Sequence, residues 1–385
     1  MENKIPEKLN FDDFFNPVHK IFKIFCIDFE SEKLKNLTKW DKIKKFLKLC
    51  YITTSLISLV IFLILQIILI IIQPKISLDD IIEFVGRSVS TPLAFTIIFL
   101  YTKRKNQIIK ILNQFRKIFP KYKMSEDKKK LQNYYNSTVN IFGKFYIRFN
   151  SFLIVIYVLF LIKGILQNDD TVALRIWLPK SINRENFCYK IFEFIWTISI
   201  TVNCLIPLCS NNLMIVTFTT ILVINFEILK NDLKVALNNS KIQLKDLKLI
   251  VDRHNELFEI SRNVREHFSI LLFIIFVQGS FTFSFYCAMI FISTDEKQIS
   301  YIINIIFGIP TMYLQYHYGQ KLIDSSENLE NGILESNWYN IKNKKIKKSL
   351  IILILRLRKS EYLTGEKWVT IQRETFTKVR NLKFI

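Results

Sequence analysis

Long apolar runs alternate with charged segments along the whole chain, and this alternation predicts helices that cross a membrane. The run 50–72 contains no charged residue and is long enough to cross a hydrocarbon core of about 30 Å. Similar runs lie near 82–101, 149–162, 194–226, 268–293 and 299–320. Because a soluble fold cannot bury so many helices that are apolar on every side, the pattern predicts an all-α, polytopic membrane protein.

Lysine and arginine gather in every second gap between these runs. They crowd residues 1–48 and the gaps after the second, fourth and sixth runs, whereas the gap after the first run holds only Lys75. Basic loops stay on the cytoplasmic side, so the N-terminus is predicted to be cytoplasmic. A seventh span would place the C-terminus outside, which is opposite to a G-protein-coupled receptor. The net charge of +21 then reflects topology, and no nucleic-acid partner is expected.

The chain lacks the residue patterns of common catalytic and metal sites. It has no glycine-rich phosphate loop and no Cys-x-x-Cys pair, and its four histidines are scattered without metal-ligand spacing. Of the six cysteines, only Cys188 falls clearly in a predicted outer loop, so no extracellular disulfide is expected. We therefore expect no enzyme, no cofactor and no metal.

The chain reads as one domain, 1–385, with seven transmembrane helices. Residues 1–48 form a cytoplasmic lead-in, 49–320 hold six spans, and 321–385 hold a cytoplasmic helix followed by the start of a seventh span. The fourth run, 194–226, exceeds one bilayer thickness and should project into the cytoplasm. Its centre contains Asn203, Ser210, Asn211 and Asn212, and polar groups at that depth face other helices or a water-filled cavity.

Two charged segments are predicted to form cytoplasmic helices. Segment 228–266 has helical apolar spacing and a high lysine and glutamate content. Segment 341–358 is basic and amphipathic, and its apolar side is formed by Leu350, Ile351, Leu353, Ile354 and Leu357.

The C-terminal third carries several short segments that are similar to one known family. They are His254, Gln278, Cys287, the segment Tyr318-Gly319-Gln320-Lys321-Leu322, the segment Glu335-Ser336-Asn337-Trp338-Tyr339, the helix 348–356 and the turn Leu363-Thr364-Gly365. Trp177-Leu178-Pro179 matches the family's second outer loop. With these segments the chain resembles insect odorant receptors, the seven-helix odorant-gated cation channels.

The resemblance implies a tuning subunit that assembles with a coreceptor subunit into a heterotetramer. It implies a location in the plasma membrane of sensory neuron dendrites, in contact with lipid. It also implies an odorant pocket in the outer half of the second, third, fourth and sixth spans. By depth, the candidate pocket residues are Phe84, Ser88, Phe152, Ile156, Tyr157, Phe194, Ile198, Tyr301 and Ile305.

Two further sets of residues follow from the resemblance. Trp338, Leu350 and Ile354 are candidates for a subunit anchor, with contact to the lipid surface as the alternative. Val379 and Leu382 are the candidates for pore lining. By the same resemblance the seventh helix is expected to be truncated, since the sequence stops about ten residues short of a full span.

Three functions stay open at this point: an odorant-gated channel subunit, a gustatory-type receptor channel, and a G-protein-coupled receptor. For each candidate pocket residue, ordinary helix packing is the alternative role.

Overall fold

The computed structural model describes residues 78–118, 187–238, 242–292 and 295–380, with isolated residues between 15 and 71 and between 148 and 159. This part of the chain is almost wholly helical, as predicted. Its elements are α3 (Leu78–Lys103), α4 (Lys105–Ile118), α7 (Phe187–Asn238), α8 (Leu244–Ile292), α9 (Asp295–Leu334), the 3-10 turn η3 (Trp338–Asn340), α10 (Lys344–Leu357), β1 (Thr364–Gly365), β2 (Val369–Thr370) and α11 (Arg373–Arg380).

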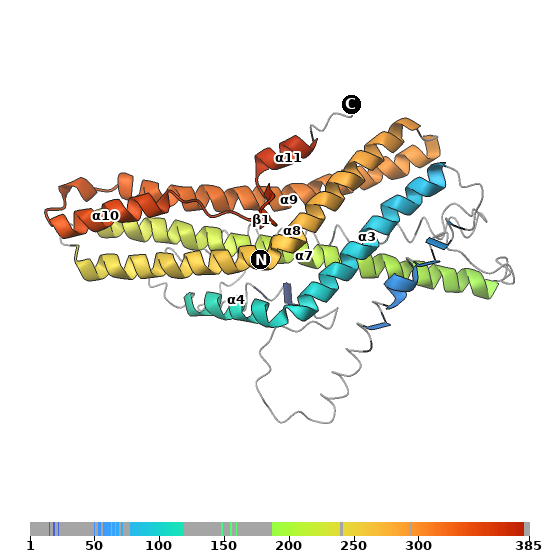
Figure 1. The fold of residues 1–385 in the computed structure, drawn as a ribbon, viewed down its shortest axis with the longest axis horizontal. Coiled ribbons are helices and arrows are strands. Elements are labelled where there is room, and N and C mark those ends of the chain that lie inside the picture. The colour runs from blue at the N-terminus through green and yellow to red at the C-terminus, as the bar shows by residue number, and fades with distance from the viewer. Residues whose placement is uncertain are drawn as a thin grey trace, which may run out of the picture.

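Three long helices organise the fold. α7, α8 and α9 lie side by side over one half of the molecule and diverge over the other half, where α3 contacts both α7 and α8 (Figure 1). α10 runs back along α9 and α8, α4 contacts α8, and α11 contacts α9. The two short strands pair antiparallel, with Thr364 opposite Thr370.

The long helices cross the boundary between apolar and charged sequence without a break. α7 contains 52 residues, which corresponds to roughly 78 Å, so the fourth apolar run does continue into a charged extension. The predicted helical region 228–266 is divided between two helices. Its first part completes α7, and the rest begins α8, where Asp246 Oδ2 accepts a hydrogen bond from the Gln243 backbone N–H at 3.1 Å.

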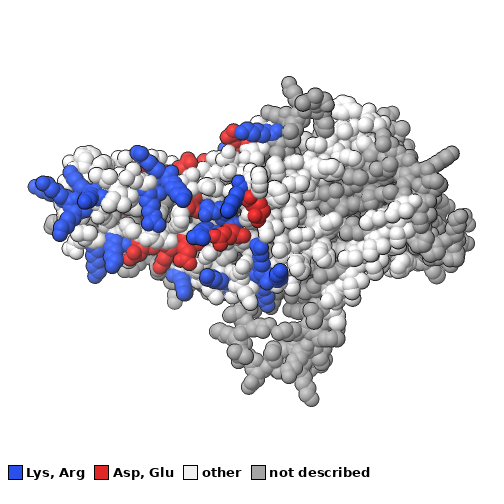
Figure 2. Space-filling model, viewed as in Figure 1, with Lys and Arg blue, Asp and Glu red and all other residues white. Residues whose placement is uncertain are grey.

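Charged side chains collect at one end of these helices. We call this end the charged half; it comprises residues 227–238, 244–266 and 321–357. The rest of α7, α8 and α9, together with α3, is the apolar half. Figure 2 shows lysine, arginine, aspartate and glutamate over the charged half and almost none over the described surface of the apolar half. Within the described residues, Ile206–Asn238 and Leu244–Ile292 are long and apolar enough to span a membrane.

Aromatic packing around Phe218 joins four segments of the chain. The Phe218 ring of α7 lies 5.9 Å from Phe15, 5.7 Å from Phe115 of α4 and 5.9 Å from Phe268 of α8, measured between ring centroids. Phe218 is fully buried. Four segments that are distant in sequence therefore meet at one side chain.

The amphipathic helix α10 forms where the sequence predicts it. Asn343 caps its N-terminus, because its side chain accepts hydrogen bonds from the backbone N–H groups of Lys345 and Ile346. The predicted apolar side holds only in part. Leu350, Leu353 and Leu357 are buried, whereas Ile351 is 50% exposed.

Candidate ligand-binding site and its connections

An aromatic cluster lies at the end of the apolar half, where α8 meets α9. Tyr301 of α9 and Met289 of α8 are its buried centre, and Phe285, Tyr286 and Ile290 pack against them. The rings of Tyr286 and Tyr301 are 5.8 Å apart at an interplanar angle of 30°. Such side chains offer a large apolar area with two hydroxyl groups, which suits a small, weakly polar ligand.

The predicted pocket residues divide into three groups. Tyr301 is buried, and Ile198 and Ile305 are half-buried. Phe84 and Ser88 fall within α3 and Phe194 falls within α7, where only the backbone is described. Phe152, Ile156 and Tyr157 lie outside the described residues.

Sequence reasoning missed the contribution of α8 to this cluster. Phe285, Tyr286 and Met289 were not predicted, although Phe281 and Phe285 have i, i+4 spacing and their rings stack at 6.0 Å. That spacing in the fifth apolar run was the available clue.

A second cluster packs α3 against α7 in the apolar half. Ile200 and Cys204 of α7 contact Ala94 of α3, and Leu59 and Phe62 complete the set. The Cys204 thiol also donates a hydrogen bond to the Thr91 hydroxyl at 3.8 Å. Ile198 lies two residues before Ile200 in the same helix.

The four polar residues predicted at the centre of the fourth run are all buried. Asn203 and Ser210 donate hydrogen bonds within α7, to Ser199 Oγ and to the Ile206 carbonyl oxygen, whereas Asn211 and Asn212 join neighbouring helices. The Tyr101 hydroxyl of α3 donates to Asn211 Oδ1 at 2.9 Å, and both residues are fully buried. The next residue, Asn212, accepts from Gln315 Nε2 of α9. Two consecutive asparagines thus connect α7 to α3 on one side and to α9 on the other, which confirms that these two polar groups face other helices.

The predicted anchor residues lie in the charged half beside α10. Leu350 is completely buried within this chain, and Ile354 and Trp338 are half-buried against the same core. The residues of α10 that point outward are Ile351, Ile352 and Leu355, which are 50%, 60% and 62% exposed. Leu350 therefore stabilises the chain's own fold, and its neighbours supply the free apolar face.

A buried carboxylate holds the segment that leaves α10. Glu361 is 2% exposed, and its Oε2 accepts from the Ser261 hydroxyl at 2.8 Å and lies 3.6 Å from Arg265 Nη1. Its backbone N–H donates to the Ser326 hydroxyl at 2.9 Å. Burial outweighs these partners and raises the pKa of Glu361. The guanidinium of Arg265 also stacks over the Tyr362 ring at 5.3 Å.

The hairpin and α11 follow this segment and are fitted closely to α8 and α9. A Cβ atom on Gly365 would lie 2.9 Å from the Phe273 backbone, and one on Gly319 would lie 2.1 Å from the Ile371 carbonyl oxygen. Phe376 of α11 packs its ring against Tyr316 of α9 at 5.6 Å. The predicted pore residue Val379 falls near the end of α11, where only the backbone is described, and Leu382 lies outside the described residues.

No group of three or more histidine, cysteine or acidic residues that could hold a metal ion occurs in the described part of the chain. The clusters described above are apolar or hydrogen-bonded, and they supply packing and orientation rather than bond-making chemistry.

Comparison with known proteins defines the class first. The fold is similar to that of the insect olfactory receptor OR5 from Machilis hrabei, with a TM-score of 0.81, 11% sequence identity, and coverage of 96% of this chain and 95% of that one. The same receptor in complex with eugenol gives a TM-score of 0.64 at 14% identity, covering 96% and 97% of the two chains. The molecule therefore has the fold of an insect olfactory receptor, a helical membrane protein.

The sequence pattern of the family described as 7tm Odorant receptor matches residues 82–384, so the chain belongs to that family. Similar proteins of Drosophila melanogaster include Odorant receptor 85b, 24% identical over 179 residues, and Odorant receptor 67c, 22% identical over 218 residues. These alignments cover 46% and 56% of this chain, and the chain spans about half the length of the two relatives, 45% and 54%. The family consists of sensory receptors and not of enzymes, as the sequence predicts.

Proposed function

We propose that this odorant receptor is a ligand-gated cation channel subunit that opens when a volatile odorant binds in the apolar half. The observation that best supports this proposal is that the molecule has an apolar half and a charged half connected by the same helices. An aromatic cluster suited to an apolar ligand lies at one end of α8 and α9, and the same continuous helices reach the charged half. A ligand that binds the open arrangement more tightly than the closed one would shift the population toward it.

In this proposal the protein is a single domain, 1–385, with seven spans, a cytoplasmic N-terminus and an extracellular C-terminus. It lies in the plasma membrane of a sensory neuron dendrite. The alternation of basic gaps supports the orientation. An epitope at the N-terminus should be accessible to antibody only after cells are permeabilised, and labelling of intact cells would refute this topology.

We propose that the charged half forms the contacts between subunits in a heterotetramer with a coreceptor. The exposed apolar face of α10, formed by Ile351, Ile352 and Leu355, supports such a contact. Trp338 and Ile354 lie beside that face, and Leu350 supports it from within. Val379 and Leu382 remain the proposed pore-lining residues.

The test is a current recording from cells that express this chain with a full-length coreceptor. An odorant panel that includes eugenol should evoke a cation current that is absent from the coreceptor alone. Surface assembly should be measured in parallel. Assembly at the surface with no current for any odorant would contradict channel function, and failure to assemble would contradict the tetramer.

The pocket is tested with two adjacent residues of α9. Tyr301→Ala removes a buried ring that contacts Tyr286, and we expect the EC50 of an active odorant to rise about tenfold, the equivalent of ~1.4 kcal/mol. The control is Ile302→Ala, because Ile302 is 40% exposed. Equal EC50 values for both variants would place the ligand elsewhere.

A further inference from the structure

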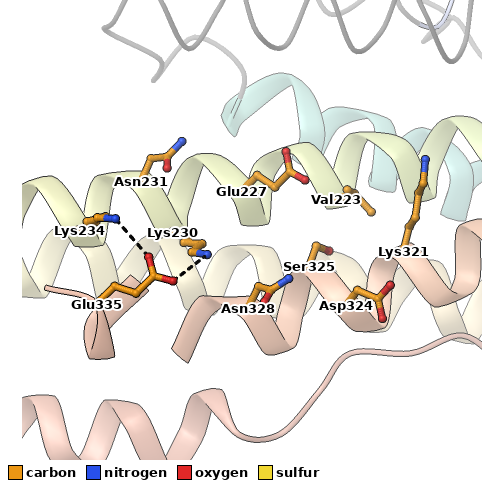
Figure 3. A pocket seen from close by; sticks show the side chains of 10 residues that line it. All are labelled: Val223, Glu227, Lys230, Asn231, Lys234, Lys321, Asp324, Ser325, Asn328 and Glu335. Atoms are coloured by element: carbon orange, nitrogen blue, oxygen red, sulfur yellow. Dashed lines mark hydrogen bonds and ion pairs between the residues drawn. The ribbon is translucent and has the colours of Figure 1, made fainter. Parts of the chain in front are cut away.

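A polar groove runs between α7 and α9 in the charged half (Figure 3). Its volume is about 520 Å³, within the range of small-molecule sites. Three lysines and three acids line it, namely Glu227, Lys230 and Lys234 of α7, Lys321 and Asp324 of α9, and Glu335. These six charges sum to zero, and a zwitterion would present a group of opposite sign to each set without adding net charge.

One end of the groove is closed by the protein's own ion pairs. Glu335 lies 3.1 Å from Lys234 Nζ and 3.8 Å from Lys230 Nζ, and these pairs are drawn in Figure 3. Both lysines lower the pKa of Glu335. Close packing continues there, since a Cβ atom on Gly332 would lie 3.0 Å from Lys230. A ligand therefore has to enter nearer to Glu227 and Lys321.

The open end lies at the boundary of the apolar half. Glu227 is the first charged residue after the uncharged run 194–226, and Lys321 is the first after the uncharged run 299–320. The two side chains come from opposite walls of the groove. If these runs span the bilayer, as proposed above, this end opens at the level of the lipid headgroups.

The charged groups of Glu227 and Lys321 are partly buried in the groove and therefore incompletely hydrated. Burial raises the pKa of Glu227, although Lys321 and Lys230 oppose that shift. Burial lowers the pKa of Lys321, and the charge of Arg373 adds to the effect. The Lys321 ammonium also lies over the Tyr318 ring at 5.3 Å. Additional groups of opposite charge would therefore stabilise both charged forms.

We propose that this groove binds a phosphoethanolamine group. Its phosphate would contact Lys321, and its primary ammonium would donate hydrogen bonds to Glu227 and Asp324. Carboxylate walls suit a primary ammonium, because a quaternary ammonium is recognised by aromatic faces instead. The group can come from a phosphatidylethanolamine headgroup of the inner leaflet or from a soluble phosphoethanolamine ester.

The proposal is tested on the full-length protein with defined probes. Detergent-solubilised protein would be incubated with equal amounts of phosphatidylethanolamine, phosphatidylcholine and phosphatidylglycerol, and retained lipid would be counted by native mass spectrometry. In a separate arm, glycerophosphoethanolamine would be titrated while the melting temperature is followed. We expect retention of phosphatidylethanolamine over both other lipids, stabilisation by the soluble ester, or both, and the arm that responds identifies the source.

Variants separate a site from adventitious binding. Glu227→Gln and Lys321→Gln should each weaken binding about tenfold, the scale of one lost charge-assisted contact. Asn328→Trp fills the groove without changing its charge, so it tests the site even if a charge variant fails to fold. The control is Lys348→Gln on the exposed side of α10. Equal retention of all three lipids without a response to the soluble ester, preference for phosphatidylglycerol, or binding that survives Asn328→Trp would overturn the proposal.

Discussion

Among the glycines whose surroundings the structure describes, Gly319 of α9 is the one at which an added methyl group should do most damage. A Cβ atom there would lie 2.1 Å from the carbonyl oxygen of Ile371 and 3.0 Å from its Cγ2 atom. The nearer atom belongs to the backbone that follows β2, so no side-chain rotation can relieve the overlap. Gly319→Ala must displace the hairpin, and with it α11, away from α9.

The expected magnitude combines two opposing effects. Glycine to alanine inside a helix normally stabilises by about 1 kcal/mol, whereas inserting a methyl group into a packed contact costs about 1–3 kcal/mol. The difference is a net loss of up to ~2 kcal/mol, which should lower the Tm by up to about 3 °C in a chain of 385 residues. The matched control is Gly308→Ala in the same helix, because a Cβ atom on Gly308 meets nothing within 4 Å.

The assay is the Tm of each fluorescently tagged full-length variant in detergent, followed by size-exclusion chromatography after heating. Gly308→Ala should melt at or above the wild-type temperature, and Gly319→Ala should melt below it. Equal Tm values for the two variants, or a higher value for Gly319→Ala, would refute the claim that the hairpin backbone packs directly against Gly319. Currents from the two variants would then show whether the same contact also sets channel opening.

Three further predictions use the same Tm measurement. Leu350→Ala should destabilise the chain by about 2–5 kcal/mol because its side chain is fully buried. Ile352→Ala should leave the Tm nearly unchanged and reduce co-purification of the coreceptor, and the opposite pattern would contradict a subunit contact at this face of α10. The raised pKa of Glu361 means that folding favours its protonated form, so the Tm should fall as the pH rises from about 4.5 through that raised pKa. Glu361→Gln should flatten this part of the plot of Tm against pH, and parallel plots for the variant and the wild type would contradict the prediction. Tyr101→Phe should cost about 1–3 kcal/mol by leaving a buried amide oxygen without its donor, whereas Tyr339→Phe, at a 59% exposed residue, should cost less than about 0.5 kcal/mol.

Much of the architecture follows from the sequence because membrane helices are encoded by local composition. The uncharged run 194–226 predicts a helix longer than a bilayer, and α7 is that helix. The depth of Asn211 and Asn212 in that run predicts interhelical hydrogen bonds, and both are present. The apolar spacing of segment 341–358 likewise predicts α10.

Side-chain surroundings were less predictable because they depend on how helices meet. Leu350 and Ile351 are adjacent and equally apolar, yet one is buried in the chain's own core and the other is exposed. Only the angle at which α10 packs on α9 decides between them. The contact of Tyr301 with Tyr286 similarly depends on the rotation of α8 about its axis, which one sequence does not reveal.

The continuity of α7 has a mechanical consequence. α7 contains Pro207, which cannot donate a backbone hydrogen bond within the helix, so the helix is weakened near that residue. If α7 nevertheless tilts as one rod of about 78 Å, a tilt of about 3° about its midpoint moves each end by about 2 Å in opposite directions. The pivot of such a rod would lie near Asn211 and Asn212, which are held by α3 and α9. A displacement at one end of α7 would then become a displacement of similar size at the other, whereas bending at Pro207 would absorb part of it.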